Sequence, residues 1–243
     1  MSDPKQMTIL GHLLEFRKRL IICAITVLAT TLASFFFYNR IIEILKKPAG
    51  NTHFIFIEVT ESFSLYMQVC LTMGVMLAIP IITYQFLRFI MPALNPRGKR
   101  MVLLVTPWAF IMFIGGVAFG YFFLIPPATK FLLNFGSNIA TIEPRMSNYI
   151  NFMMKMLLTI GLVFETPVVT TFLARMGIIS YRWLANKRRW WILIAFVLAA
   201  VITPTPDAVN QTIVAGTLIV LLEVSIWLAW FVERGKKKNQ TAS

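Results

Sequence analysis

The chain has 243 residues, of which 58% are hydrophobic and 14% are charged, and its mean hydropathy is +0.73. This composition excludes an ordinary soluble domain and is typical of a protein that crosses a membrane several times. The net charge of +13 would suggest nucleic acid in a soluble protein. Here the bases fit loops that lie against anionic lipid headgroups, so we expect membrane lipid and no nucleic acid as a partner.

The chain begins with a cytoplasmic lead-in, residues 1–19, whose last part is amphipathic. Projected as a helix, its apolar side chains share one broad arc, and Arg17 falls inside that arc. Such a helix would lie on the membrane surface before turning into the bilayer. Glu15 is the single acid in the ionised run that ends at Arg19. Pairing with Lys18 and Arg19 would make it an ordinary surface salt bridge, worth a few tenths of a kcal/mol.

Four apolar runs of spanning length follow the lead-in. The first has 19 residues, and as a helix it would extend about 28 Å, close to the thickness of the hydrocarbon core. Pro80 should kink the second run, and Pro126 and Pro127 should end the third. Gly115, Gly116 and Gly120 allow close contact between helices. The four runs are Leu20–Tyr38, Phe63–Leu87, Met101–Ile125 and Tyr149–Ala174.

The last two runs form a short hairpin. The fifth, Trp190–Ile202, has 13 residues, which gives about 20 Å of helix and is well short of a full span. A tight turn at Thr203–Asp207 connects it to the sixth, which ends near Trp230. We expect the bilayer to thin beside this hairpin, or water to enter from one face. Residues 232–243 are expected to be a disordered basic tail.

The distribution of bases sets the orientation. Lys and Arg number 17 in the two terminal segments and the second and fourth connections, against 5 in the other connections. The positive-inside rule then predicts six transmembrane helices in a single all-α domain, with both termini cytoplasmic. The long connections Asn39–Ser62 and Ala128–Asn148 would build a lid on the outside.

Acids inside the spans are candidates for function. Glu165 lies deep in the fourth run, where an ionised carboxylate costs at least about 2.5–3.5 kcal/mol, so it must be protonated, paired or beside water. Both a hydrogen-bonded structural role and a polar contact in a cavity remain open, and Pro167 favours a broken helix. For Glu223, structural and functional roles are equally open. Thr203 and Gln211 would either cap the hairpin or contact a partner's transmembrane helix.

The sequence offers no sign of an enzyme. It contains no Gly-x-Ser-x-Gly, no His-Glu-x-x-His and no glycine-rich phosphate loop with lysine. His12 and His53 lie on opposite sides of the membrane and cannot share a metal ion. We expect no catalytic residues, no metal and no cofactor.

Five stretches in chain order resemble the TatC family, the polytopic subunit of the twin-arginine protein translocase, nearly end to end. They are His12–Leu20, Pro80–Phe86 with Arg88–Leu94, Gly161–Pro167, Pro206–Asp207 with Gln211, and Leu222–Glu223. Carried over by position, the resemblance implies signal-peptide recognition by Glu15, Arg17 and Phe89. The other implied positions are Glu165 as the polar residue of a concave groove, Thr203 and Gln211 in the partner-helix contact region, Pro48 and Asp207 in loops, and Glu223 as an intramembrane acid.

The resemblance also implies a function. Proteins of this family bind twin-arginine signal peptides of folded cargo at the cytoplasmic face of the inner membrane. They assemble single-span partner subunits of the TatA/TatB type into a hetero-oligomer, and export uses the proton-motive force. Two alternatives stay open: a proton-coupled transporter of small solutes that uses Glu165, and a TatC-like scaffold that no longer reads twin arginines.

One departure from the family pattern concerns the loop after Leu94. The family usually has an acid here, whereas this chain has Gly98, and no Asp or Glu occurs between Thr83 and Thr141. This loop therefore has no carboxylate for a guanidinium. If the chain reads paired arginines through carboxylates, Glu15 carries more of the recognition than it does in the usual pattern.

Overall fold

The computed structural model describes residues 9–90, 97–134, 143–202 and 208–240. In these ranges the chain is built from helices and their connections, with one isolated bridge between Ile55 and Arg145, so the predicted all-α fold is confirmed. The elements are α1 (Ile9–Phe36), α2 (Tyr38–Lys46), η1 (Lys47–Ala49), α3 (Glu61–Ile90), α4 (Arg97–Phe119), η3 (Gly120–Leu124), α5 (Ile125–Asn134), α6 (Met146–Phe164), α7 (Thr166–Met176), α8 (Tyr181–Asn186), α9 (Arg188–Ile202) and α10 (Ala208–Gln240).

Five helical stretches within these ranges are long and apolar enough to cross a membrane. The expected fifth span corresponds to α9, whose 15 residues correspond to about 22 Å, less than the hydrocarbon core. Six spans therefore remain a prediction. The five stretches are Leu10–Phe36, Glu61–Phe89, Val105–Asn134, Met146–Met176 and Gln211–Arg234.

Three helix ends differ from the sequence-based expectations. The amphipathic lead-in and the first span form one helix, α1, without the expected turn between them. The third span does not end at Pro126 and Pro127, because a π-helical turn, η3, precedes them. Both prolines then lie in the first turn of α5, where backbone amides need no helical partner. Helix α10 continues to Gln240, through most of the tail expected to be disordered, since Glu, Arg and Lys favour helix.

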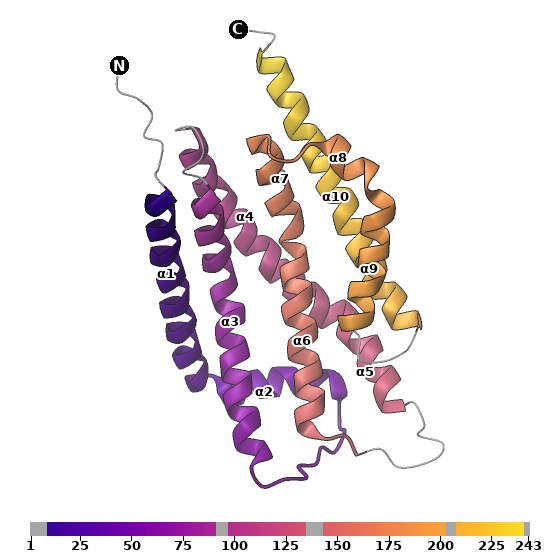
Figure 1. Cartoon of the computed structure of the whole chain (residues 1–243). Coiled ribbons are helices and arrows are strands. Elements are labelled where there is room, and N and C mark those ends of the chain that lie inside the picture. Colours follow the sequence, from indigo (N-terminus) through magenta and orange to yellow (C-terminus); the bar gives the residue numbers. More distant parts are fainter. Residues whose placement is uncertain (1–8, 91–96, 135–142, 203–207, 241–243) are drawn as a thin grey trace.

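The helices form an elongated bundle (Figure 1). Helix α1 begins and α10 ends at the same end, which we call the terminal end; the opposite one is the far end. Helix α1 packs mainly against α3, and α10 against α7 and α9, while α4 crosses the bundle obliquely against α6 and α5 packs against η1. The main core lies around α6, which buries Ile150, Met153, Met156 and Ile160.

Two glycines permit close helix contacts. A Cβ atom on Gly74 of α3 would lie 2.6 Å from the Cα of Thr31 on α1, so only glycine lets these backbones approach. Gly116 lies as closely against the side chain of Phe164 on α6, which confirms the role predicted for it. Gly115 faces open space instead.

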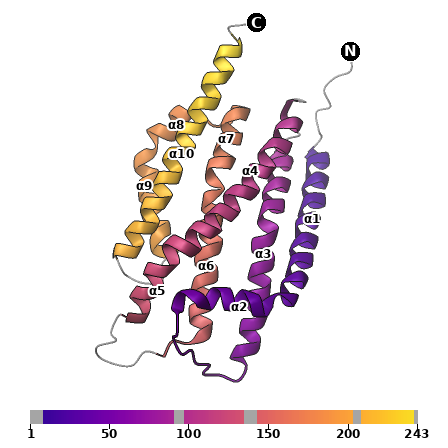
Figure 2. The same cartoon turned by 180° about the vertical axis from the view of Figure 1, so that it is seen from behind.

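A cap covers the far end, where α2 lies across the bundle (Figure 2). The hydroxyl of Tyr121 donates to the carbonyl of Ile44 at 2.8 Å, and that of Tyr149 donates to the carbonyl of Leu45 at 3.1 Å. These bonds satisfy carbonyls in the last turn of α2, which a helix leaves without intrahelical partners. The first connection thus forms an ordered cap over the far end, and its helix was not predicted. That this end faces outward stays a prediction.

Candidate functional site

A pocket of about 380 Å³ opens between α1 and α3 toward the terminal end. Glu15 enters it from α1, four residues before Arg19, and Gln85 enters from α3. The helical spacing of Glu15, Arg19 and Ile22 places them on one face of α1, against the last turns of α3. The lining residues are Leu14, Glu15, Lys18, Arg19, Ile22, Gln85 and Arg88.

Glu15 forms the predicted ion pair with Arg19, but the pair is not a surface salt bridge. The side chains are only 18% and 13% exposed, respectively. The guanidinium of Arg19 contacts Oε1 of Glu15 and also donates through Nη1 to Oε1 of Gln85 at 3.2 Å. Oε2 of Glu15 is buried and has no hydrogen-bond partner among the described residues. One carboxylate oxygen of Glu15 is therefore left without a donor among the described residues.

Phe89 lies next to this pocket in an aromatic cluster that the sequence analysis did not identify. Its ring stacks on that of His12 at 4.4 Å between centroids and packs against that of Phe16 at 5.4 Å. The spacing of His12 and Phe16, four residues apart on a helix, could have indicated the pair. The structure therefore brings Phe89 and Glu15 to the same α1–α3 interface. Arg17 is exposed and does not line the pocket.

Glu165 lies at the break between α6 and α7, as the Pro167 pattern predicted. The residue is 4% exposed, and Thr83 of α3 donates a hydrogen bond to its Oε2. Oε1 is buried with no hydrogen-bond partner in the described part of the chain. The structural role left open by the sequence is therefore present as a hydrogen bond between helices. The predicted concave groove remains untested by these contacts.

Glu223 and Gln211 both hold the α9–α10 hairpin together. Glu223 pairs with Arg188 at 2.8 Å, and Nε2 of Gln211 donates to the carbonyl of Phe196 at 3.4 Å. These contacts agree with the structural interpretation of both residues. Pro48 lies in η1, which packs against α5. Thr203 and Asp207 lie outside the described residues.

A polar network at the far end was missed by the sequence analysis. Arg145 lies 2.8 Å from the buried carboxylate of Glu61 and 3.3 Å from that of Glu58, and Ser147 donates to Glu61. Closeness to Glu61 raises the pKa of the Arg145 guanidinium above its ordinary value. The adjacent bridge joins Ile55 to the segment before α6. Contacts between residues that are 84 or more positions apart cannot be predicted from a single sequence.

The residues that the structure describes contain no group of three His, Cys, Asp or Glu side chains able to hold a metal ion. The α1–α3 pocket contains a carboxylate with one unpaired oxygen, bases that flank it, and aromatic rings beside it. A guanidinium could donate a charge-assisted hydrogen bond to that oxygen.

Comparisons with known proteins agree on one family. Residues 11–216 match the model for "Sec-independent protein translocase protein (TatC)". A TatC from Carboxydothermus hydrogenoformans is 36% identical over 95% of this chain and 96% of its own length. One from Aquifex aeolicus is also 36% identical, over 97% of this chain and 100% of its own length. A crystal structure of the twin-arginine translocase receptor TatC is 36% identical and superposes with a TM-score of 0.81, covering 91% of this chain and 99% of that one.

Proposed function

The chain belongs to the TatC family of Sec-independent protein translocase proteins, and we propose that its α1–α3 pocket receives the paired arginines of a twin-arginine signal peptide. The observation that carries this proposal is the free, buried Oε2 of Glu15 inside a pocket large enough for a side chain. A guanidinium bound there would form a charge-assisted hydrogen bond with a poorly solvated carboxylate.

The resident Arg19 already occupies one oxygen of Glu15. An incoming arginine would compete with it for the carboxylate. Gln85 accepts a hydrogen bond from Arg19 in the unliganded arrangement, so it can hold the displaced guanidinium without leaving it unpaired. Recognition is then an exchange of one arginine for another around Glu15. Phe89, beside the pocket, would pack against the apolar side chains near the cargo's arginines, and Arg17 would contact the peptide from the exposed side of α1.

The same proposal includes the topology and the location. Six spans, with both termini cytoplasmic in an inner membrane, agree with the excess of bases in the segments at the terminal end. The start of α1 and the end of α10 share that end (Figure 1). The α1–α3 pocket would then face the cytoplasm, where unexported cargo is found.

The partner subunits would be single-span proteins of the TatA/TatB type, which join the chain in a hetero-oligomer. Export by this hetero-oligomer would use the proton-motive force. We propose that their contacts lie at the α9–α10 hairpin and include Gln211, because α9 is short and apolar. By sequence, Thr203 and Asp207 are further candidates for this contact region. Glu165 would act as the polar residue of the groove once a passing segment replaces Thr83 on its carboxylate.

Site-specific crosslinking tests this function. A photoreactive residue replaces Phe89, and the purified membranes receive a signal peptide with two arginines or the same peptide with two lysines. We expect strong crosslinking with arginines and weak crosslinking with lysines, because lysine cannot form the two-pronged contact. Equal labelling by both peptides, or by neither, would favour the scaffold. Uptake of a small solute by the purified chain in liposomes would favour the transporter.

A further inference from the structure

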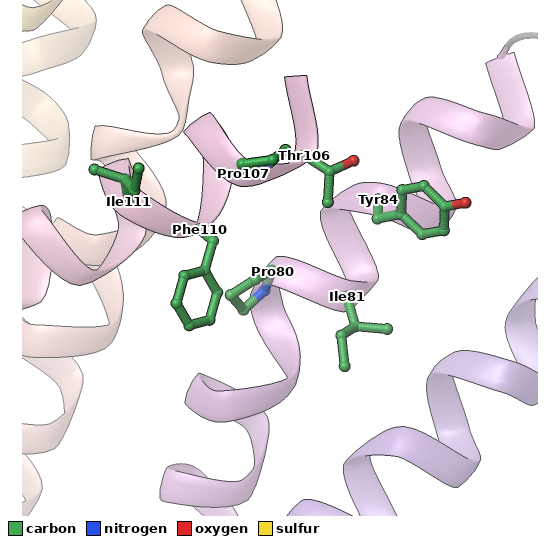
Figure 3. A pocket seen from close by; sticks show the side chains of 7 residues that line it. All are labelled: Pro80, Ile81, Tyr84, Thr106, Pro107, Phe110 and Ile111. Atoms are coloured by element: carbon green, nitrogen blue, oxygen red, sulfur yellow. The ribbon is translucent and has the colours of Figure 1, made fainter. Parts of the chain in front are cut away.

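A second pocket adjoins the first on the other side of α3. It is apolar, has a volume of about 550 Å³, and lies between α3 and α4 (Figure 3). Both helices contain a proline at this level, Pro80 in α3 and Pro107 in α4. Each proline removes a backbone hydrogen bond and disturbs the regular surface of its helix. The pocket is lined by Pro80, Ile81, Tyr84, Thr106, Pro107, Phe110 and Ile111.

This apolar pocket opens onto the outer surface of the bundle. The side chains of Ile81, Phe110 and Ile111 are between 42% and 57% exposed. In a membrane this face meets lipid chains rather than water. A single hydrocarbon chain fits such a recess, which offers apolar contacts on two helices.

Arg88 joins the two pockets. It lines the polar pocket, and its guanidinium also lies over the ring of Tyr84, 5.8 Å from the centroid, with Nη1 3.2 Å from the tyrosine hydroxyl. Tyr84 in turn lines the apolar pocket. A basic group therefore lies at the junction between a polar recess and a hydrocarbon recess.

The charge balance of the polar recess favours an anion beside Arg88. The recess contains the bases Lys18, Arg19 and Arg88 and the acid Glu15, and that acid is already paired with Arg19. Lys18 and Arg88 therefore remain as positive charges on facing helices. A phosphate between them would neutralise this excess of positive charge, since basic groups near the membrane surface attract anionic lipids.

We propose that Arg88 and the pocket beside it form a binding site for an anionic phospholipid, with the phosphate at Arg88 and one acyl chain between Pro80 and Pro107. This arrangement matches the ligand in both chemistry and order along α3: the head group lies nearer the terminal end, and the chain lies deeper. A neutral lipid would fill the apolar pocket but would leave Arg88 unneutralised.

The site shares the α1–α3 pocket with the proposed twin-arginine function but does not rest on that function. The phosphate lies on the α3 wall at Arg88, whereas the cargo's guanidinium would lie at Glu15 on α1. A bound anion would also offset the bases that repel a cationic peptide. The occupant is a lipid rather than a peptide because the site pairs a base, Arg88, with an adjoining recess that is apolar throughout.

Photolabelling with lipids tests the proposal without any cargo. The purified full chain is placed in phosphatidylcholine nanodiscs that contain a trace of phosphatidylglycerol with a photoreactive group in one acyl chain. A matched phosphatidylcholine probe serves as the neutral comparison. We expect the anionic probe to label the α3 and α4 residues of the pocket in preference to the neutral probe, as mapped by mass spectrometry of labelled peptides.

Substitutions test whether Arg88 is responsible for the preference for the anionic probe. Arg88→Gln should reduce labelling by the anionic probe roughly fivefold and leave the neutral probe unchanged, since one base near the membrane surface contributes about that much. Arg88→Lys should retain most of the preference. Arg182→Gln is the matched control, because Arg182 stacks on Tyr181 at 5.9 Å in the same way but lines neither pocket.

The outcomes separate the possibilities. Equal labelling by both probes in the unaltered chain would show an apolar recess without head-group selection and would overturn the proposal. So would a preference that survives Arg88→Gln, or one that Arg182→Gln reduces equally. Ile111→Trp, which fills the apolar recess, should reduce labelling by both probes. Thermal unfolding of each variant shows whether it remains folded.

Discussion

Thr83 on α3 donates a hydrogen bond to Glu165 at the break between α6 and α7, across 82 residues of sequence. Both residues are buried. The bond joins two helices at the level where α6 ends, and it partly satisfies a carboxylate that the bilayer would otherwise leave without a partner. Its removal should therefore affect the whole bundle rather than a single helix.

Replacing Thr83 by valine should lower the free energy of unfolding by about 1–3 kcal/mol, because the buried carboxylate loses a donor while the shape is kept. Thermal unfolding of the purified protein in detergent measures the change. Thr171→Val is the control, since the hydroxyl of Thr171 bonds to the carbonyl of Pro167 in its own helix. Equal losses in the two variants would contradict an inter-helix role for Thr83.

Replacing Glu15 by glutamine should weaken binding of a twin-arginine peptide roughly tenfold to a hundredfold, because a charge-assisted hydrogen bond becomes a neutral one. Peptide titration with a fluorescent label measures this affinity. Glu43→Gln removes an acid that is paired with Arg40 on the exposed face of α2, and it should leave binding unchanged. Wild-type affinity in the Glu15 variant would refute the role given to that carboxylate.

Replacing Arg19 by glutamine should strengthen peptide binding. Its guanidinium competes with the ligand for Glu15, and because the pair is largely buried, its hydrogen bond to a charged group contributes about 1.5–3 kcal/mol, which corresponds to a gain of roughly tenfold or more. Lys18→Gln removes the same charge from the same pocket and serves as the control. If both variants gain equally, the effect is net charge and the proposed exchange of arginines is wrong.

Replacing Arg145 by methionine should loosen the first connection at the far end. Glu61 then loses its cationic partner but keeps its bond from Ser147, and the bridge between Ile55 and Arg145 loses the ion pair beside it. Hydrogen exchange should speed up at the amides of Ile55 and Met146, which bond across that bridge. Arg40→Met breaks an ion pair whose side chains are both exposed, and it should leave these amides protected.

Replacing Gly74 by alanine should separate α1 from α3, because the new Cβ would overlap the backbone of Thr31. Overpacking of this kind costs about 1–3 kcal/mol. Gly115→Ala is the control, since nothing lies within 4 Å of its added atom. The melting temperature should fall for the first variant and stay level for the second. A change at Gly115 as large as that at Gly74 would exclude close helix packing as the cause.

Hydropathy was sufficient to predict the helical fold and most of the spans, because a membrane helix satisfies its own backbone within one segment. Hydropathy did not predict local changes in helix geometry or the short helix α2. The π-helical turn η3 leaves no signature in composition, and so Pro126 and Pro127 were interpreted as a stop. Helix α2 was missed although Ile41, Ile42 and Leu45 lie at helical spacing, since its short run was taken for a loop.

The candidate site was predictable where the interacting residues are close in sequence. The pair between Glu15 and Arg19 follows from their spacing on one helix. The bonds from Thr83 to Glu165 and from Arg19 to Gln85 depend on how helices are rotated and offset, and sequence periodicity does not fix either quantity. The same reason explains why the contacts of Arg145 with Glu58 and Glu61 were missed.

The residues that line the α1–α3 pocket all lie between Leu14 and Arg88, within the first two spanning helices. Protein synthesis proceeds from the N-terminus, so both walls of this pocket exist as soon as those two helices have left the ribosome and paired in the membrane. Glu165, the core around α6 and the α9–α10 hairpin have not yet been made at that point. The nascent chain thus contains the groups that would bind the signal peptide before it contains those that would take part in transport.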